Sequence, residues 1–445
     1  MCFLKKHRMF STKIAKLRCK ILTSYSLDKS RTKIWELFEA QLYNNNCNSY
    51  KTEKKVFYMS FDFEQTITIL KKLYSHMSDE DFRMKFWFDF PAIPVALYDD
   101  EKVFIAGYPR KLDGFKKHNG VLVGKKDNRF YGNTAIELEG EQVAIWDLTT
   151  IGPSVSFGRL LSLIFHEAFH GYQKIRGEKR WANELQILEY PFIEQNLAMR
   201  FLERRKLLNV VFSSSEKEFR ENLSRFIDLR ENRRKLIGDS INYELAQESI
   251  EGVAIYVETK VYSQHESLPL DYVIALQGKN IGELDLNLRK LRLSCYAPGM
   301  FIAFILDRID NHWQEKYVNS EKYIYDFVRE LADIATSKSH SEEIPHDVIE
   351  RSRNILEHYK KFIDEKFSEF GSSDGYKIIL KGNFPLMGMD PMNIIWKDQY
   401  ILNEHFFATE FNKTKIFIRQ KNKVKRIGKE YRFNEITFFL SLIHI

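Results

Sequence analysis

The chain has 445 residues, which is long enough for two or three domains that each bury a hydrophobic core. The formal net charge of +7 is modest, and acids and bases are interleaved along most of the sequence, so a nucleic-acid partner is not expected. The four cysteines lack CxxC spacing, which argues against a disulfide scaffold or a cysteine zinc site and favours a reducing, cytoplasmic compartment.

Residues 1–54 form a basic tail or extension that departs from this balance. Seven lysines and arginines precede the first acid, Asp28, with apolar residues between them. A solvated tail is the simplest interpretation, while a transit peptide, a surface-binding amphipathic helix and a later start at Met9 or Met59 stay open. No apolar run reaches the length of a membrane span, so no integral membrane segment is expected.

Residues 55–153 carry the pattern of a mixed sheet domain. A helical period over residues 63–76 is followed by short β-type runs with Asp, Asn and Gly at the turns between them. These turn residues suit hairpins, so the runs predict an antiparallel sheet rather than a βαβ unit. The predicted strands are 95–98, 103–106, 121–123, 134–138 and 142–146.

Long helices dominate residues 154–370, and β-type runs return in residues 371–445. Ser214 or Ser215 caps the start of one helix that Gly238 closes, and Gly177 closes the first helix of this region. The predicted helices are 154–176, 192–210, 215–237, 240–263, 298–318, 321–337 and 346–370, and the later strands are 376–380, 400–402 and 415–419. The chain is therefore predicted to be α+β, with a sheet domain, a mainly helical domain and a small β-rich C-terminal region.

The first helix of this region contains the pattern HExxH, from His166 to His170. Two histidines four residues apart lie on one helical face, so both imidazoles can reach a single tetrahedral Zn²⁺ ion. Glu167 then stands beside the open coordination position, where it can act as the general base for water. Apolar residues on the rest of the helix predict burial, and buried histidines need partners, which a metal supplies. A hydrogen-bonded histidine pair without metal is the alternative.

A second segment, Glu248 to Glu258, supplies a candidate third ligand. Its sequence ESIEGVAIYVE resembles the glutamate segment of the gluzincins, which include thermolysin and the zinc aminopeptidases. The resemblance implies a zincin-like catalytic domain in which Glu251 is the third zinc ligand, and Glu258 also fits the family pattern. Gly252 and Ala254 are small enough to let this helix approach the HExxH helix closely.

Four glutamates of this stretch, Glu244, Glu248, Glu251 and Glu258, fall near one helical face. Such a row is unfavourable unless a cation or buried bases neutralise it, so it favours a metal site over a solvated acidic stripe. In such a site, Glu244 or Glu248 is expected to orient an imidazole.

A third segment begins at Tyr296, in the sequence YAPGM that opens an apolar run. It resembles the aminopeptidase branch, where a tyrosine in this place stabilises the tetrahedral intermediate, and the resemblance gives that catalytic role to Tyr296. The chain has 22 tyrosines, so a structural role is the alternative. Tyr243, Tyr256 and His312 compete for the catalytic role.

The chain departs from the aminopeptidases in two ways. First, 80 residues separate the two zinc segments, enough for two inserted helices. Their arginines are expected to be solvated, with one available for a substrate carboxylate: Arg204, Arg205, Arg230, Arg233 and Arg234. Second, the segment that grips a free N-terminus is missing, although an edge strand at 132–137 or 142–146 is placed to bind a substrate backbone. Glu137, Glu139 or Glu141 could hold an amino group, so exopeptidase and endopeptidase both stay open.

The function predicted from these segments is zinc-dependent hydrolysis of a peptide or protein substrate. The alternative is a non-catalytic zinc-binding protein of gluzincin fold that acts as a binding or sensory module. A third option is a scaffold in which the polar residues pair only with one another. The sequence leaves the substrate preference and the oligomeric state open.

Overall fold

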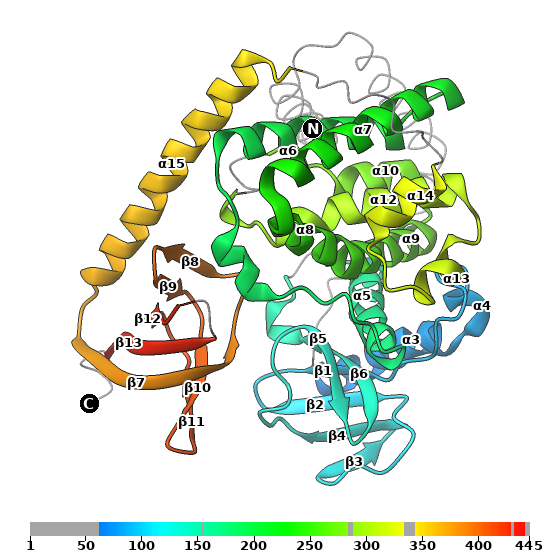
Figure 1. Cartoon of the computed structure of the whole chain (residues 1–445). Coiled ribbons are helices and arrows are strands. Elements are labelled where there is room, and N and C mark those ends of the chain that lie inside the picture. Colours follow the sequence, from blue (N-terminus) through cyan, green and yellow to red (C-terminus); the bar gives the residue numbers. More distant parts are fainter. Residues whose placement is uncertain (1–61, 153–154, 284–287, 333–342, 429–430, 441–445) are drawn as a thin grey trace, which may run out of the picture. The chain divides into compact units, whose positions relative to one another are not determined.

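The computed structural model describes residues 62–152, 155–283, 288–332, 343–428 and 431–440. The basic N-terminal stretch, the proposed starts at Met9 and Met59 and the end of the predicted helix 321–337 lie outside these residues. The described residues form two compact units (Figure 1). The first comprises 62–179, Val253–Glu283 and Asn311–Glu321, and the second comprises Arg180–Gly252, 288–310 and 322–440.

The first unit contains a six-stranded sheet in the order β3-β4-β2-β1-β6-β5, drawn in cyan in Figure 1. Its strands are β1 (Val95–Tyr98), β2 (Lys102–Ala106), β3 (Phe115–His118), β4 (Val121–Lys125), β5 (Thr134–Leu138) and β6 (Glu141–Asp147). The predictions for 95–98 and 134–138 are confirmed residue for residue, whereas β3, which is mostly exposed and lacks an alternating pattern, was not predicted.

This sheet is mixed rather than purely antiparallel, which corrects the prediction. β1 runs parallel to β6, with Val95 opposite Ala144, while the other neighbouring strands are antiparallel. Turn residues predict only the hairpins between consecutive strands. β1 and β6 are separated by the rest of the sheet in the sequence, so the connection between them is long enough to bring the chain back in the same direction.

Helices of the first unit pack on this sheet and on one another. They are α3 (Phe63–Ser78), α4 (Glu80–Arg83), α5 (Phe157–Ile175), α9 (Val253–Glu266), α10 (Leu270–Gln277) and α13 (Trp313–Val318). α5 begins at Ser156, whose hydroxyl accepts a hydrogen bond from the Arg159 N–H. α5 packs against β5, β6 and α9, so the HExxH helix is covered by the sheet and by α9.

The second unit contains the remaining helices: α6 (Glu194–Val211), α7 (Glu216–Ile237), α8 (Ile241–Gln247), α12 (Tyr296–Ile309), α14 (Ile324–Leu331) and α15 (His346–Gly371). α6 packs along α7, and α12 packs against α6 and α14. The predicted helix 298–318 is two helices, α12 and α13, because the chain is extended at Asp310. No helix among the described residues is long and apolar enough to cross a bilayer.

The predicted helix 240–263 contains a π-helical turn. α8 is followed directly by η4 (Glu248–Gly252), in π-helical form, and then by α9. Gly252 lies against Gly299 at the start of α12, and a Cβ atom on either glycine would overlap backbone atoms of the other segment. The close approach expected of Gly252 is therefore made to α12.

A seven-stranded antiparallel sheet completes the second unit and confirms the β-rich character of residues 371–445. Its order is β11-β10-β7-β13-β12-β9-β8, shown in orange to red in Figure 1. The strands are β7 (Tyr376–Met389), β8 (Ile394–Lys397), β9 (Tyr400–Asn403), β10 (Phe407–Phe411), β11 (Thr414–Ile418), β12 (Asn422–Arg426) and β13 (Arg432–Leu440). Ile401, Val424 and Ile436 meet across β9, β12 and β13 and are fully or almost fully buried.

Candidate metal centre

The HExxH residues lie in the buried middle of α5. His166, Glu167 and His170 have exposed fractions of 8%, 9% and 7%. The neighbouring apolar residues Phe165 and Phe169 are buried against Phe90, so the flank of the helix beside the histidines is packed against aromatic rings. The expected buried setting of the motif is therefore present.

Glu258 on α9 holds the outer nitrogen of His166. The Nδ1 atom of His166 lies 3.0 Å from Glu258 Oε2, and Glu258 Oε1 accepts hydrogen bonds from Arg159 at 2.5 Å and Gln277 at 2.8 Å. Burial alone would raise the pKa of Glu258, but the hydrogen bond from His166 and the charge of Arg159 outweigh burial and lower this pKa. Glu258 is thus a carboxylate and can only accept, so His166 Nδ1 carries the proton.

His170 is fixed in the same way from its own helix. Its Nδ1 atom lies 2.8 Å from the side-chain oxygen of Gln173, one turn later on α5. With Nδ1 as the donor in both rings, each Nε2 carries a lone pair, and the two Nε2 atoms are 3.1 Å apart. At this distance the pair can be stabilised in two ways, by a cation that both nitrogens bind or by a proton that one ring donates to the other.

Glu251 belongs with His166 and His170 to a group that could hold a metal ion. One ligand atom each from His166, His170 and Glu251 lies within 4.8 Å of the others, and all three residues are buried. Glu251 belongs to the π-helical turn η4, and α9 follows this turn without a break. Single π turns inside helices are rare and recur at functional sites, because the extra residue changes where one side chain points.

Within the second unit, Arg292 binds the carboxylate of Glu251. Arg292 Nη2 donates to Glu251 Oε1 at 2.8 Å, and Arg292 Nε donates to Glu184 Oε1 at 3.0 Å. Tyr243 and Gln247 also donate to Glu184, which fixes this second acid. The sequence analysis missed Arg292 and Glu184. Neither belongs to a motif, and the only local hint is that Arg292 precedes Tyr296 by one helical turn.

Tyr296 lies in this same cluster. Its hydroxyl accepts a hydrogen bond from Arg292 Nη1 and is hydrogen-bonded to Glu251. Burial and the charge of Glu251 raise the pKa of Tyr296 well above its usual value, so the phenol keeps its proton. The competitors are placed otherwise: Tyr243 donates to Glu184, Tyr256 accepts from Lys260, and His312 is largely exposed.

The donor set of two imidazoles and one carboxylate is one that zinc accepts. No protein-family model, no curated protein and no solved structure matches this chain. Its function therefore has to be inferred from the residues and their geometry alone.

Two expectations about the flanking charges are wrong. Glu244 and Glu248 do not orient an imidazole: Glu244 pairs with Arg200 and Arg233, and Glu248 pairs with Arg230. The orienting carboxylate is Glu258. The arginines predicted to be solvated also differ among themselves, because Arg204, Arg230 and Arg233 are at most 1% exposed, whereas Arg205 and Arg234 are only partly buried.

Of the two strands considered for a substrate backbone, β5 lies at the sheet edge, whereas β6 lies between β1 and β5 and is not an edge strand. Lys174, one turn beyond His170 on α5, donates to the Ala135 carbonyl of β5 at 2.5 Å. Burial lowers the pKa of Lys174, while the charges of Glu167 and Glu137 oppose that shift. Of the acids considered for binding an amino group, Glu141 is paired with Arg110 at 2.7 Å.

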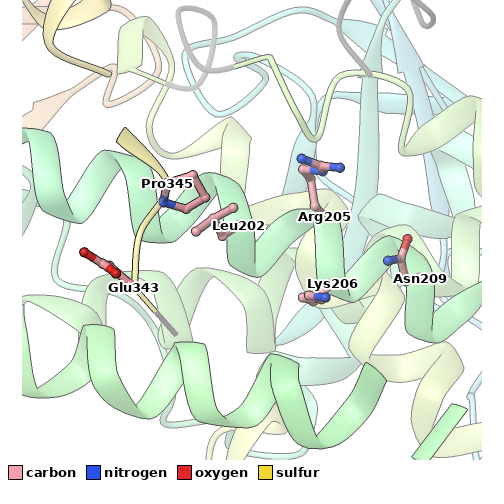
Figure 2. Close-up of a pocket in the computed structure, with 6 residues that line it drawn as sticks. All are labelled: Leu202, Arg205, Lys206, Asn209, Glu343 and Pro345. Atoms are coloured by element: carbon pink, nitrogen blue, oxygen red, sulfur yellow. The ribbon is translucent and has the colours of Figure 1, made fainter. Parts of the chain in front are cut away.

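A separate hollow of about 370 Å³ lies on α6 in the second unit (Figure 2). It is lined by Leu202, Arg205, Lys206, Asn209, Glu343 and Pro345. None of these residues belongs to the metal-centre segments, so the hollow is not part of the candidate site.

Proposed function

We propose that this chain is a zinc-dependent metallohydrolase that cleaves peptide bonds. One observation carries the proposal: the Nε2 atoms of His166 and His170 face each other at 3.1 Å, within reach of a Glu251 oxygen, while both Nδ1 atoms are held by acceptors. In this arrangement three ligand atoms converge and the histidine tautomers are already set.

His166, His170 and Glu251 would hold the zinc ion. A zinc ion in this place polarises a carbonyl group and lowers the pKa of water towards neutrality. Glu258 and Gln173 keep the imidazole rings in position by accepting their Nδ1 protons. Arg292 donates to one oxygen of Glu251 and so helps to hold the carboxylate of the third ligand in place.

The chain's own groups supply the proton transfers and the substrate contacts. Glu167, next to His166 on α5, takes a proton from the attacking water and delivers it to the leaving amine. Tyr296 keeps its proton, and it would donate to the oxyanion that develops on the substrate carbonyl by exchanging its hydrogen bond to Glu251. The edge strand β5 can bind the substrate backbone by strand addition.

A non-catalytic zinc-binding module remains the second candidate. It needs the same three ligands but has no use for a buried carboxylate at Glu167, which is only 9% exposed. Retention of this side chain in the buried motif therefore favours catalysis.

The test combines metal analysis with a peptide-library assay on wild type, Glu167→Gln and the exposed control Glu80→Gln. We expect about one zinc per chain in all three, and a loss of cleavage of about 10²–10⁴-fold in Glu167→Gln alone. A chelator should abolish wild-type cleavage, and added zinc should restore it. Wild-type cleavage by zinc-loaded Glu167→Gln would contradict the proposal. Zinc without cleavage would favour the binding module, and absence of zinc would favour the scaffold.

A further inference from the structure

The second unit encloses a group of buried charged side chains where α6, α7 and the segment α8–η4 meet. Their exposed fractions are 2% or less. We refer to them as the arginine–glutamate network: Arg200, Arg204, Arg230, Arg233, Glu203, Glu244 and Glu248. Four positive charges therefore stand against three negative charges in a region without solvent.

Three of the four arginines are paired. Arg230 binds Glu203 at 2.6 Å and Glu248 at 2.8 Å. Arg233 also binds Glu203, at 2.8 Å, and binds Glu244 at 2.5 Å. Arg200 binds Glu244 at 3.0 Å. Each of the three glutamates is thus already engaged by at least one of these three arginines.

Arg204 is different. Its Nη2 atom donates to the Ser294 carbonyl at 2.7 Å, but its Nη1 atom is buried and makes no hydrogen bond to any described residue. No carboxylate of the described residues forms an ion pair with it. Burial and the nearby charge of Arg200 lower the pKa of Arg204 to about 10, so the side chain is still a cation at neutral pH. Buried charges are normally paired, because an unpaired one loses its hydration without compensation.

The carboxylates whose charge acts on Arg204, Glu203 and Glu244, already pair with the other three arginines, and its remaining neighbours are neutral. Burial raises the pKa of the Cys295 thiol to about 12 and raises that of Tyr190 as well, so both stay neutral. Burial also raises the pKa of Glu248, while the charge of Arg230 opposes this shift. A water molecule could satisfy Nη1 but would leave the charge unbalanced.

We propose that Arg204 holds a small monovalent inorganic anion, of the size of chloride, inside the second unit. The anion accepts a hydrogen bond from Nη1 and balances the fourth arginine. The hollow on α6 is a different place, since its lining includes Arg205 and Lys206 and not Arg204 (Figure 2). The proposal does not depend on the proposed peptidase activity.

Anion binding would also steady the turn η5 (Leu293–Cys295), which Arg204 holds through Ser294. Arg292 precedes this turn and Tyr296 follows it, and both contact Glu251. The anion would thus act as a structural element beneath the residues that surround the third ligand.

The first experiment measures the melting temperature of the full chain at constant ionic strength while gluconate is replaced by chloride or bromide. In the wild type we expect a rise of about 1.5 °C when the halide reaches ten times its dissociation constant. Arg204→Met should lose this rise. Arg205→Met, which changes the next residue on the outer side of α6, should keep it.

The second experiment uses a wild-type crystal soaked in bromide, with its anomalous signal as the readout. We expect a bromide peak within about 3.5 Å of Arg204 Nη1. Either of two results would overturn the proposal: no halide-dependent rise in the wild type, or no anomalous peak beside an ordered Arg204. An equal rise in Arg204→Met would place the anion elsewhere and would also overturn it. If Arg204→Met fails to fold, the wild-type crystal still shows whether a halide binds beside Arg204.

Discussion

The two buried polar clusters of this chain balance their charges differently. On α5 and α9, the carboxylate of Glu258 contacts both Arg159 and His166 Nδ1. The Nε2 atoms of His166 and His170 face each other. In the arginine–glutamate network, carboxylates and guanidinium groups pair with one another, and Arg204 alone is left over. The first cluster could therefore hold a cation, whereas we propose an anion for the second. Burial of charge alone does not distinguish the two cases, because the partners of each buried group decide which ion it can bind.

The largest expected effect is a loss of stability when one arginine of the arginine–glutamate network is replaced. Arg233→Met removes the partner of Glu203 and Glu244 and should lower the free energy of unfolding by about 3–5 kcal/mol, because it leaves buried carboxylates uncompensated. Urea unfolding followed by circular dichroism measures this. Arg234→Met is the matched control, since Arg234 is partly exposed and should cost less than about 1 kcal/mol. An equal loss of unfolding free energy in both variants would mean that the buried ion pairs contribute no more to stability than a partly exposed one.

The next effect concerns the first cluster and should appear in metal binding rather than in folding. Glu258→Gln removes the negative charge behind His166 and should weaken zinc affinity by about 10–100-fold. Competition with a zinc indicator measures the change. Glu266→Gln, at the end of the same helix and in contact with Ser156, should leave zinc affinity as it is. Unchanged affinity in Glu258→Gln would mean that this carboxylate does not orient a ligand.

The smallest effect is the dependence of stability on pH. Burial alone would raise the pKa of Glu244, but Arg200 and Arg233 hold it well below its usual value; likewise, Arg230 and Arg233 outweigh burial and lower the pKa of Glu203. A carboxylate with a lowered folded pKa stabilises the fold fully above its unfolded pKa, and this contribution is lost as the pH falls through the folded pKa.

We therefore expect the free energy of unfolding to be nearly constant above about pH 5 and to fall below about pH 4.5. Urea titrations between pH 3 and pH 7 measure it, with a chelator in every sample so that metal release does not contribute. A flat profile down to pH 3 would show that these carboxylates are not held by their arginines.

Much of the fold was predictable because its signals are local. The strands 95–98 and 134–138, the capped helix at Ser215 and the long helix starting near His346 follow from periods and turn residues within a few positions of each other. The parallel pairing of β1 with β6 was not predictable in this way. It depends on where a distant strand enters the sheet, and turn chemistry carries no information on that.

The sequence by itself determined that His166 and His170 share one face of a buried helix, because helical geometry fixes side chains four residues apart. It also singled out Glu251, through a resemblance. Only the tertiary structure decided which acids contact the histidines and which form ion pairs with buried arginines. It alone showed that Arg292 binds Glu251. The physical reason is that a buried charge is stabilised by whatever lies across the packing interface, and α6, α7 and α9 contribute those partners from distant parts of the chain.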